Sequence, residues 1–401
     1  MGPLSGIKVV EMGIFVAGPA TAAVLADWGA DVVKVENPAG GDPIRALVSL
    51  GLVPVEPDLN PSLELENRNK RSITVDVTKP EGREVLLRML RDADVFVSNF
   101  RAGALARAGL AYEDVKKVNP RIVYATLSGY GNRGPDKDRA AFDYAAFWAR
   151  TGAMASLGEP DDPPPTQRPA MGDHMAGLQF AGAISAALFH RERTGEGQAV
   201  HLSLFQVGLW MMASDIETAL ALGFGYERTG RVMPNPLWNH YRAKDGKWFH
   251  LVMVQADRFW PQFCEAIGRT ELVKDLRYAD IIKRRENSQS LIDELDRVFA
   301  TRTRDEWTPI FDRYELIWAP VQTVLEASRD PQALALEAYA RIPHRSGKEF
   351  PYVKSPVEFA STPATIRHGA PELGEHTEEI LLANGYSWHD IAALRDKGVL
   401  G

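Results

Sequence analysis

Short apolar runs alternate with helical patterns through the first third of this chain, and this alternation limits its possible folds more than any other feature. Residues 7–11 form an apolar run typical of a buried strand, residues 19–28 follow a helical pattern, and residues 31–36 form the next apolar run. A strand, a helix and a second strand in such close succession predict a parallel βαβ unit. We therefore expect the chain to begin with an α/β fold.

The alternation continues beyond this first unit. Residues 72–77, 94–98 and 122–127 have the composition of further strands, and a helical pattern runs to residue 92. The segment 78–81, Thr-Lys-Pro-Glu, matches a capping box with proline in the first turn, which predicts that this helix begins there. Strands that alternate with helices in this way predict a Rossmann-like, doubly wound sheet with helices on both faces.

The length of the chain predicts more than one domain. Its 401 residues exceed what a single hydrophobic core usually serves. A proline- and glycine-containing stretch at 228–236 is typical of a linker, and Asp-Gly at 245–246 between two apolar runs predicts a hairpin. We predict a large Rossmann-like domain over 1–225, a smaller α+β domain over 226–330, and a C-terminal segment over 331–401 that returns to the large domain.

Charge and cysteine content exclude several classes of protein. The formal net charge of -7 argues against a nucleic-acid binder, which usually presents a basic surface, although a local cationic pocket remains compatible with it. The single cysteine, Cys264, allows no intrachain disulfide and fits a reducing compartment. We find no signal peptide, no apolar run long enough to cross a membrane, and no histidine spacing typical of a metal site. We therefore expect a cytoplasmic protein without a bound metal.

The segment Gly172-Asp173-His174 stands where an apolar helix over 175–189 is predicted to begin. A carboxylate at a helix N-terminus interacts with the positive end of the helix dipole, which favours the ionised form that a nucleophile needs. Aspartate is also a common N-cap residue. The residues alone therefore allow either a catalytic or a capping role for Asp173.

Aromatic residues surround a single acid, Asp143, in the segment 142–148. Their spacing fits one face of a core helix. It also fits an apolar wall for an acyl group, with Asp143 as an orienting partner.

Several cations follow the predicted strands at the edge where doubly wound sheets bind ligands. The alternative interpretation is that they are solvated surface charges that bind no ligand. They are Arg71, Arg101, Arg107, Arg133, Lys137 and Arg139.

Taken in order, these segments resemble the class III CoA-transferase family over nearly the whole chain. The resemblance is carried by residues 3–11, 17–20, 29–36, 69–73, 98–101, 103–105, 129–131, 172–173, 193–198 and 374–377. It implies a Rossmann-like large domain, a small domain, and a dimer whose two chains pass through each other as interlocked rings. A homodimer is expected, and assembly with a paralogous subunit is the alternative.

The resemblance also implies the chemistry of the site. Asp173 would attack an acyl-CoA thioester and pass through an aspartyl-acyl anhydride and an enzyme thioester. Coenzyme A would be a substrate, and no tightly bound cofactor is expected. Asn37 stands where close relatives have an arginine, so Arg71 is a candidate to replace that contact. The implied substrate and CoA contacts are Phe15, Val16, Ala17, Arg71, Asn99, Phe100, Arg107, Lys137 and Asp143.

Two alternatives to a transferase follow from the same family. Related acyl-CoA racemases have a histidine directly before the acid that corresponds to Asp143, whereas this chain has Phe142, and α-proton exchange needs two acid/base groups. The other alternative is a non-catalytic subunit of a heteromeric transferase, against which an intact Asp173 argues. Within the family, the chain is most similar to transferases of aromatic and branched acids such as phenyllactate and benzylsuccinate. The glycine-rich loop of formyl-CoA transferase has no counterpart, so we do not expect oxalate or formate as substrates.

Overall fold

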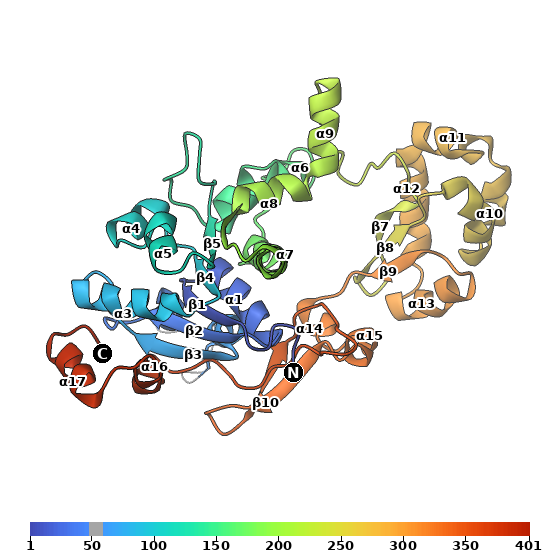
Figure 1. Ribbon diagram of the computed structural model, residues 1–401. Coiled ribbons are helices and arrows are strands. Elements are labelled where there is room, and N and C mark those ends of the chain that lie inside the picture. The colour runs from blue at the N-terminus through green and yellow to red at the C-terminus, as the bar shows by residue number, and fades with distance from the viewer. Residues whose placement is uncertain (48–58) are drawn as a thin grey trace. The chain divides into compact units, whose positions relative to one another are not determined.

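The computed structural model describes residues 1–47 and 59–401, which form two compact units (Figure 1). The first unit contains the larger part of the chain, in three stretches: 1–154, 166–225 and 337–401. The second unit contains residues 155–165 and 226–336.

A six-stranded parallel sheet forms the centre of the first unit. The strands are β1 (Lys8–Met12), β2 (Asp31–Glu36), β3 (Lys70–Thr74), β4 (Val95–Ser98), β5 (Val123–Ser128) and β6 (Gln198–Ser203). They lie in the order β3-β2-β1-β4-β5-β6, and every neighbouring pair is parallel. This is the strand order of the doubly wound dinucleotide-binding fold, so the predicted α/β architecture is confirmed. Such sheets bind ligands at the carboxyl ends of the strands where the order reverses, here β1 and β4.

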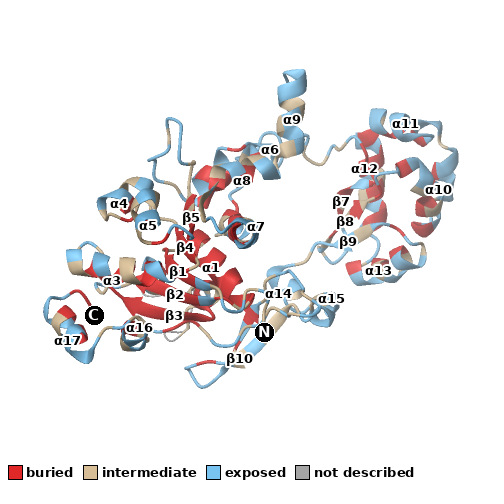
Figure 2. Ribbon diagram, in the orientation of Figure 1, coloured by how far each residue is buried: buried red, intermediate tan, exposed pale blue. Residues whose placement is uncertain are grey.

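Helices cover both faces of this sheet. Successive residues of a strand point to opposite faces, so one strand can contribute side chains to two separate cores. Val9 of β1 lies in one hydrophobic core and Val10 lies in the other. The first core is completed by α1 (Ala17–Asp27) and α7 (Met171–Thr194). The second is completed by α3 (Pro80–Arg91), α16 (Thr377–Ala383) and α17 (Trp388–Asp396). Figure 2 shows the buried residues concentrated along the sheet between these layers.

Shorter elements complete the first unit. They are the 3-10 helix η1 (Pro43–Ala46), α2 (Pro61–Asn67), α4 (Ala102–Arg107), α5 (Tyr112–Val118), the π-helix η2 (Tyr144–Ala149), α8 (Leu204–Met211), α9 (Ala213–Leu222), and the hairpin β10 (Tyr339–Pro343) and β11 (Glu349–Val353). The short helix α6 (Ala153–Ser156) contains the point at which the chain leaves the first unit.

The predicted capping box at the start of α3 is wrong. The N-cap residue is Lys79, which makes no side-chain cap, and the helix begins at Pro80. The hydroxyl group of Thr78 instead donates to Asp76 Oδ1 at 2.6 Å. Glu81 pairs with Lys397 at 2.8 Å. Both side chains of the expected box are therefore held by partners outside the helix end.

The second unit is an α+β structure around its own core. Its strands β7 (Trp238–Arg242), β8 (Trp248–Val252) and β9 (Trp318–Pro320) form an antiparallel sheet. The turn between β7 and β8 contains Gly246 at φ 80°, which confirms the predicted Asp-Gly hairpin. The other elements are α10 (Ala256–Ala266), the 3-10 helices η3 (Thr270–Lys274) and η4 (Leu276–Tyr278), α11 (Ile281–Glu286), α12 (Ser288–Phe299), α13 (Arg304–Arg313), α14 (Val324–Ala327) and α15 (Pro331–Ala335).

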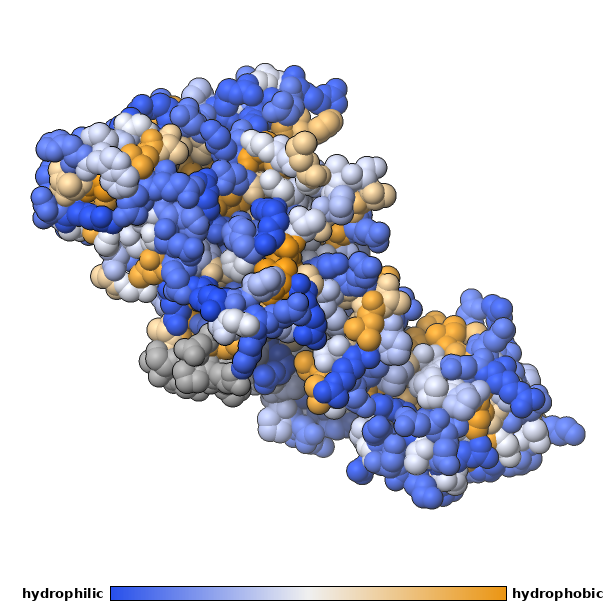
Figure 3. Space-filling model, turned by 90° about the horizontal axis from the view of Figure 1, so that it is seen from below, coloured by the Kyte–Doolittle hydropathy of each residue, from blue (hydrophilic) through white to orange (hydrophobic). Residues whose placement is uncertain are grey.

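Hydrophilic residues dominate the face of the molecule in Figure 3, where hydrophobic residues gather in separate patches. Large apolar side chains are also exposed on α8 and α9, where Trp210 is 74% exposed and Leu220 is 82% exposed. No helix within residues 1–47 and 59–401 is both long enough and apolar enough to span a bilayer. Exposed apolar groups of this kind suit contact with another protein surface.

Candidate active site

Asp173 lies in the first turn of the long helix α7. The helix begins at Met171, so Asp173 is its third residue. The N-cap position belongs to Ala170, in the left-handed region at φ 65°. The predicted start of this helix at Asp173 is therefore wrong by two residues, and Asp173 has no capping role.

Two glycines hold the first turns of α7 close to their neighbours. A Cβ atom on Gly172 would lie 2.4 Å from Cγ of Phe147 in the π-helix η2. A Cβ atom on Gly177 would lie 3.0 Å from the Cβ atom of Ala20 in α1. Larger side chains at these positions would force α7 away from both helices, so the packing fixes where the Asp173 carboxyl group lies.

The Asp173 side chain is partly buried, and its surroundings favour the protonated form. Its pKa is raised to about 7, chiefly by burial and also by the negative charges of Asp143 and Glu66, whereas His174 lowers it. The expectation that the helix N-terminus would keep this carboxyl group ionised is therefore wrong. Loss of water and two like charges outweigh the helix dipole.

Asp143 supports the same turn from the segment before η2. Its side chain is only 2% exposed, and its Oδ2 atom accepts hydrogen bonds from Gln167 Nε2 at 2.8 Å and from the backbone N–H of Gly172 at 3.3 Å. Burial raises the pKa of Asp143 despite these donors. The bond to Gly172 ties Asp143 to the residue that directly precedes Asp173.

The turn between β1 and α1 has an unusual backbone that side chains hold from two sides. Phe15 is a non-glycine residue at φ 58°, and its N–H donates to Asp42 Oδ1 at 2.9 Å. Asn99, after β4, accepts from the N–H of Ile14 at 2.9 Å and donates to its carbonyl at 2.8 Å. Strained backbone held in this way is typical of binding sites.

Asp42 belongs to a buried group of charges beneath this turn. Lys34 Nζ lies 2.9 Å from Glu11 Oε1 and 2.9 Å from Asp42 Oδ2. Lys70 Nζ lies 2.7 Å from Glu11 Oε2, and burial lowers the pKa of Lys70 to about 8 although Glu11 opposes the change. Each charge has an opposite partner, and removing Lys34 or Glu11 would take away the ion-pair partner of Asp42 or of Lys70.

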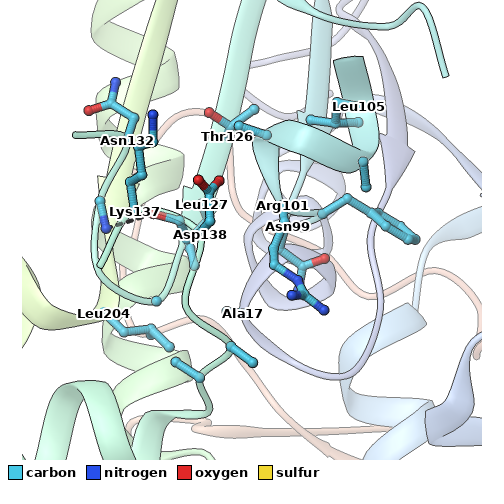
Figure 4. A pocket seen from close by; sticks show the side chains of 18 of the residues that line it. Ala17, Asn99, Arg101, Leu105, Thr126, Leu127, Asn132, Lys137, Asp138 and Leu204 are labelled. Carbon is cyan, nitrogen blue, oxygen red and sulfur yellow. Dashed lines mark hydrogen bonds between the residues drawn. The ribbon is translucent and has the colours of Figure 1, made fainter. Parts of the chain in front are cut away.

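A cavity of about 1070 Å³ opens at the carboxyl ends of β1, β4 and β5. Figure 4 shows Asn99 and Arg101 reaching into it from the end of β4, and Asn132 and Lys137 from the loop that follows β5. Eight of the ten residues that the sequence predicts for the site line this cavity: Phe15, Val16, Ala17, Asn99, Phe100, Arg107, Lys137 and Asp173.

The other two predicted residues lie elsewhere. Arg71, on β3, pairs with Asp31 at 2.7 Å and with Glu379 at 2.8 Å, and it does not line the cavity. Asp143 lies behind the wall that its neighbours Phe142 and Tyr144 form.

The sequence prediction missed other residues of this region. Tyr112 and His201 line the cavity, Glu66 contacts His174, and Gln167 donates to Asp143. Arg101, which the sequence analysis names among the cations at the strand ends, also lines the cavity.

The lining combines cations with apolar surface. No ion pair joins Arg101, Arg107 or Lys137 to a carboxylate within the described part of the chain, so their charges are available to an anionic ligand. The rings of Phe15 and Phe142 meet edge to face with centroids 5.4 Å apart. The cavity therefore suits a ligand with an anionic part and an apolar part, beside a carboxyl group that titrates near neutral pH.

Comparison with known proteins assigns this arrangement to an enzyme class. The model described as CoA-transferase family III matches residues 4–377. The (R)-2-hydroxy-4-methylpentanoate CoA-transferase of Clostridioides difficile is 35% identical over 399 residues, 99% of each chain. The cinnamoyl-CoA:phenyllactate CoA-transferase of Clostridium sporogenes is 34% identical, over 99% of this chain and 97% of that one.

A solved structure, of a CAIB/BAIF family protein from Brucella suis, matches with a TM-score of 0.85 and 32% identity, over 96% of this chain and 99% of that one. The fold and the sequence relatives together define a class III acyl-CoA:carboxylate CoA-transferase, an enzyme that uses CoA thioesters as substrates. The chain belongs to CoA-transferase family III.

The raised pKa of Asp173 predicts that the free energy of unfolding falls as the pH rises and this group ionises. A carboxyl group whose pKa is about 7 in the folded state and about 3.9 in the unfolded state destabilises the fold increasingly as pH rises from 4 to 7. Urea unfolding of Asp173→Asn and wild type should therefore diverge over this range, with the variant gaining more than about 1 kcal/mol by pH 8.

Met171→Leu changes the same turn without a titratable group, and its curve should run parallel to that of the wild type. An Asp173→Asn curve that also runs parallel to the wild type would contradict the raised pKa.

Proposed function

We propose that Asp173 is the nucleophile that carries the acyl group between donor and acceptor. One of its carboxylate oxygens attacks the thioester carbon of the donor acyl-CoA, the carbon–sulfur bond breaks, and CoA leaves as a thiolate. The thiolate then attacks the side-chain carbon of the resulting anhydride. This step releases the donor as a carboxylate and leaves CoA on Asp173 as a thioester.

The acceptor reverses these steps. Its carboxylate oxygen attacks the enzyme thioester, which forms a second anhydride and releases the CoA thiolate. The thiolate attacks the acyl carbon of the acceptor, and Asp173 returns as a carboxylate. Each intermediate is an activated acyl group, so the site must exclude water, and the partial burial of Asp173 supports this.

The single observation that carries this proposal is the position of Asp173 in a cavity that also has apolar surface and cations without a carboxylate partner among residues 1–47 and 59–401. We propose that CoA lies along Phe15, Val16 and Ala17, with Arg107 and Lys137 near its phosphates. Phe142 has no acid/base group, which supports transfer over racemisation.

We further propose that the acceptor is an aromatic or branched carboxylic acid, such as a phenyllactate- or benzylsuccinate-like acid. The Phe15–Phe142 pair supplies apolar surface beside the proposed nucleophile. Two similar proteins are named for a branched and an aromatic 2-hydroxy acid. Aromatic side chains favour such acyl groups because they bury large apolar areas.

Removal of the proposed nucleophile should abolish transfer. Asp173→Asn and Asp173→Ala are expected to lower kcat at least about 1000-fold, because no covalent intermediate can form. Hydroxylamine added to wild type during turnover should modify Asp173, as located by mass spectrometry. Asp215→Asn is the matched control, because Asp215 is also the third residue of a helix but is exposed on α9. Normal transfer by Asp173→Asn would contradict the proposal.

The aromatic wall predicts acceptor preference. Phe142→Ala should lower kcat/KM for an aromatic acceptor about two- to ten-fold, since an aromatic pair is worth about 0.5–1.5 kcal/mol. The value for acetate should change less. Phe189→Ala removes an exposed ring elsewhere and should change neither. Equal losses for both acceptors in Phe142→Ala would argue against an aromatic subsite.

The family resemblance and the exposed apolar side chains of α8 and α9 support an interlocked homodimer as the working form. Light scattering after size exclusion should then give twice the 44.3 kDa mass of one chain. A fully active monomer would contradict this proposal. Activity that appears only after a paralogous chain is added would indicate a heteromeric enzyme instead.

A further inference from the structure

The residue that follows Asp173 makes a contact that the proposed transfer chemistry does not use. His174 Nε2 lies 2.7 Å from Glu66 Oε1, at hydrogen-bonding and ion-pairing distance. The imidazole is 45% exposed, whereas the Glu66 side chain is 3% exposed. A carboxylate buried to this degree needs a charged or hydrogen-bonded partner, and His174 supplies one.

Glu66 is held in place by the anchoring of helix α2. Arg68, directly after this helix, pairs with Asp27 of α1 at 2.7 Å. Glu64, one turn earlier, accepts from the backbone N–H of Ala370 at 2.9 Å. These bonds fix α2 on both sides, so the Glu66 carboxylate is presented to His174 from a rigid support.

Asp173 and His174 are each surrounded by several charged groups. Asp173 is faced by the negative groups of Asp143 and Glu66 and by the positive group of His174 on its own helix. His174 is faced by Glu66 and Asp173, and by Arg68, whose own charge is paired. His174 directly follows Asp173 and lies 2.7 Å from Glu66, so its protonated ring offsets the repulsion between the acidic groups around Asp173.

We propose that His174, held by Glu66, is a positioning residue that supplies a positive charge beside Asp173 and increases the ionised share of this nucleophile in the partly buried site. The proposal rests on the proposed function of Asp173. It gives the Glu66–His174 pair a role in the reaction, although neither side chain lines the cavity or needs to touch the substrate.

The sign of the effect follows from the charges. Burial alone would lower the pKa of His174, but the hydrogen bond and the negative charge of Glu66 outweigh it and raise the pKa. A protonated imidazole lowers the pKa of Asp173. Loss of this cation should raise the pKa of Asp173, so a larger share of the enzyme would carry a protonated, inactive carboxyl group at neutral pH.

The test is the pH profile of kcat/KM for the acyl-CoA donor, which reports groups on the free enzyme. In His174→Gln, the acidic limb should move up by about one pH unit, with a loss of about ten-fold at pH 6 and near-normal rates at pH 9. His174→Lys keeps a cation and should keep the limb near its wild-type position. In the double variant His174→Gln/Glu66→Gln, the limb should move back down, because the repelling carboxylate is also gone.

The profiles separate an electrostatic role from a structural one. A uniform loss at every pH in His174→Gln, or an unchanged profile, would overturn the proposal. So would equal shifts in the Gln and Lys variants. The result is distinct from failure of the proposed function: if Asp173→Asn is inactive while the His174→Gln limb stays in place, only the positioning role is wrong. If Asp173→Asn is fully active, the nucleophile assignment itself is wrong.

Discussion

Removal of the Asp173 carboxyl group from water is the constraint on which the site depends. The close packing of α7 against α1 and η2, at Gly177 and Gly172, places this group in the wall of the cavity. This burial, together with the negative charges of Asp143 and Glu66, raises its pKa to about 7, so the group titrates near neutral pH. A less buried carboxylate would be more ionised but also more hydrated, and it would leave the proposed anhydride intermediate open to water.

Another part of the cavity lining, the turn between β1 and α1, depends on a second set of buried charges. Lys34 links Glu11 of β1 to Asp42, and Asp42 holds the backbone of Phe15 in its left-handed conformation. Asn99 holds the neighbouring peptide from β4. This turn is therefore fixed by side chains on or next to β1, β2 and β4, so its geometry does not need a ligand to form it.

Local sequence patterns predicted the parallel sheet, whereas the charge environment of Asp173 depends on contacts between distant segments. Apolar runs marked five of the six parallel strands, whereas β6 went unrecognised because most of its residues are only partly buried. The raised pKa of Asp173 could not be predicted, because it depends on burial in the folded chain and on the charges of Asp143 and Glu66, which approach from other segments. The contact between Glu66 and His174 joins residues 108 positions apart, and no periodicity or spacing indicates such a pair.

The most direct test of the account follows the oxygen atoms through one catalytic cycle. The acceptor acid is labelled with oxygen-18 in both carboxyl oxygens and incubated with an acyl-CoA donor and the enzyme. The enzyme is then digested, and the masses of its peptides are measured by mass spectrometry. If Asp173 forms an anhydride with the acceptor, its carboxyl group keeps the bridging oxygen, and the peptide that contains Asp173 becomes heavier by one oxygen-18. Labelled acyl-CoA product without label in this peptide would show that the acyl group never reaches Asp173.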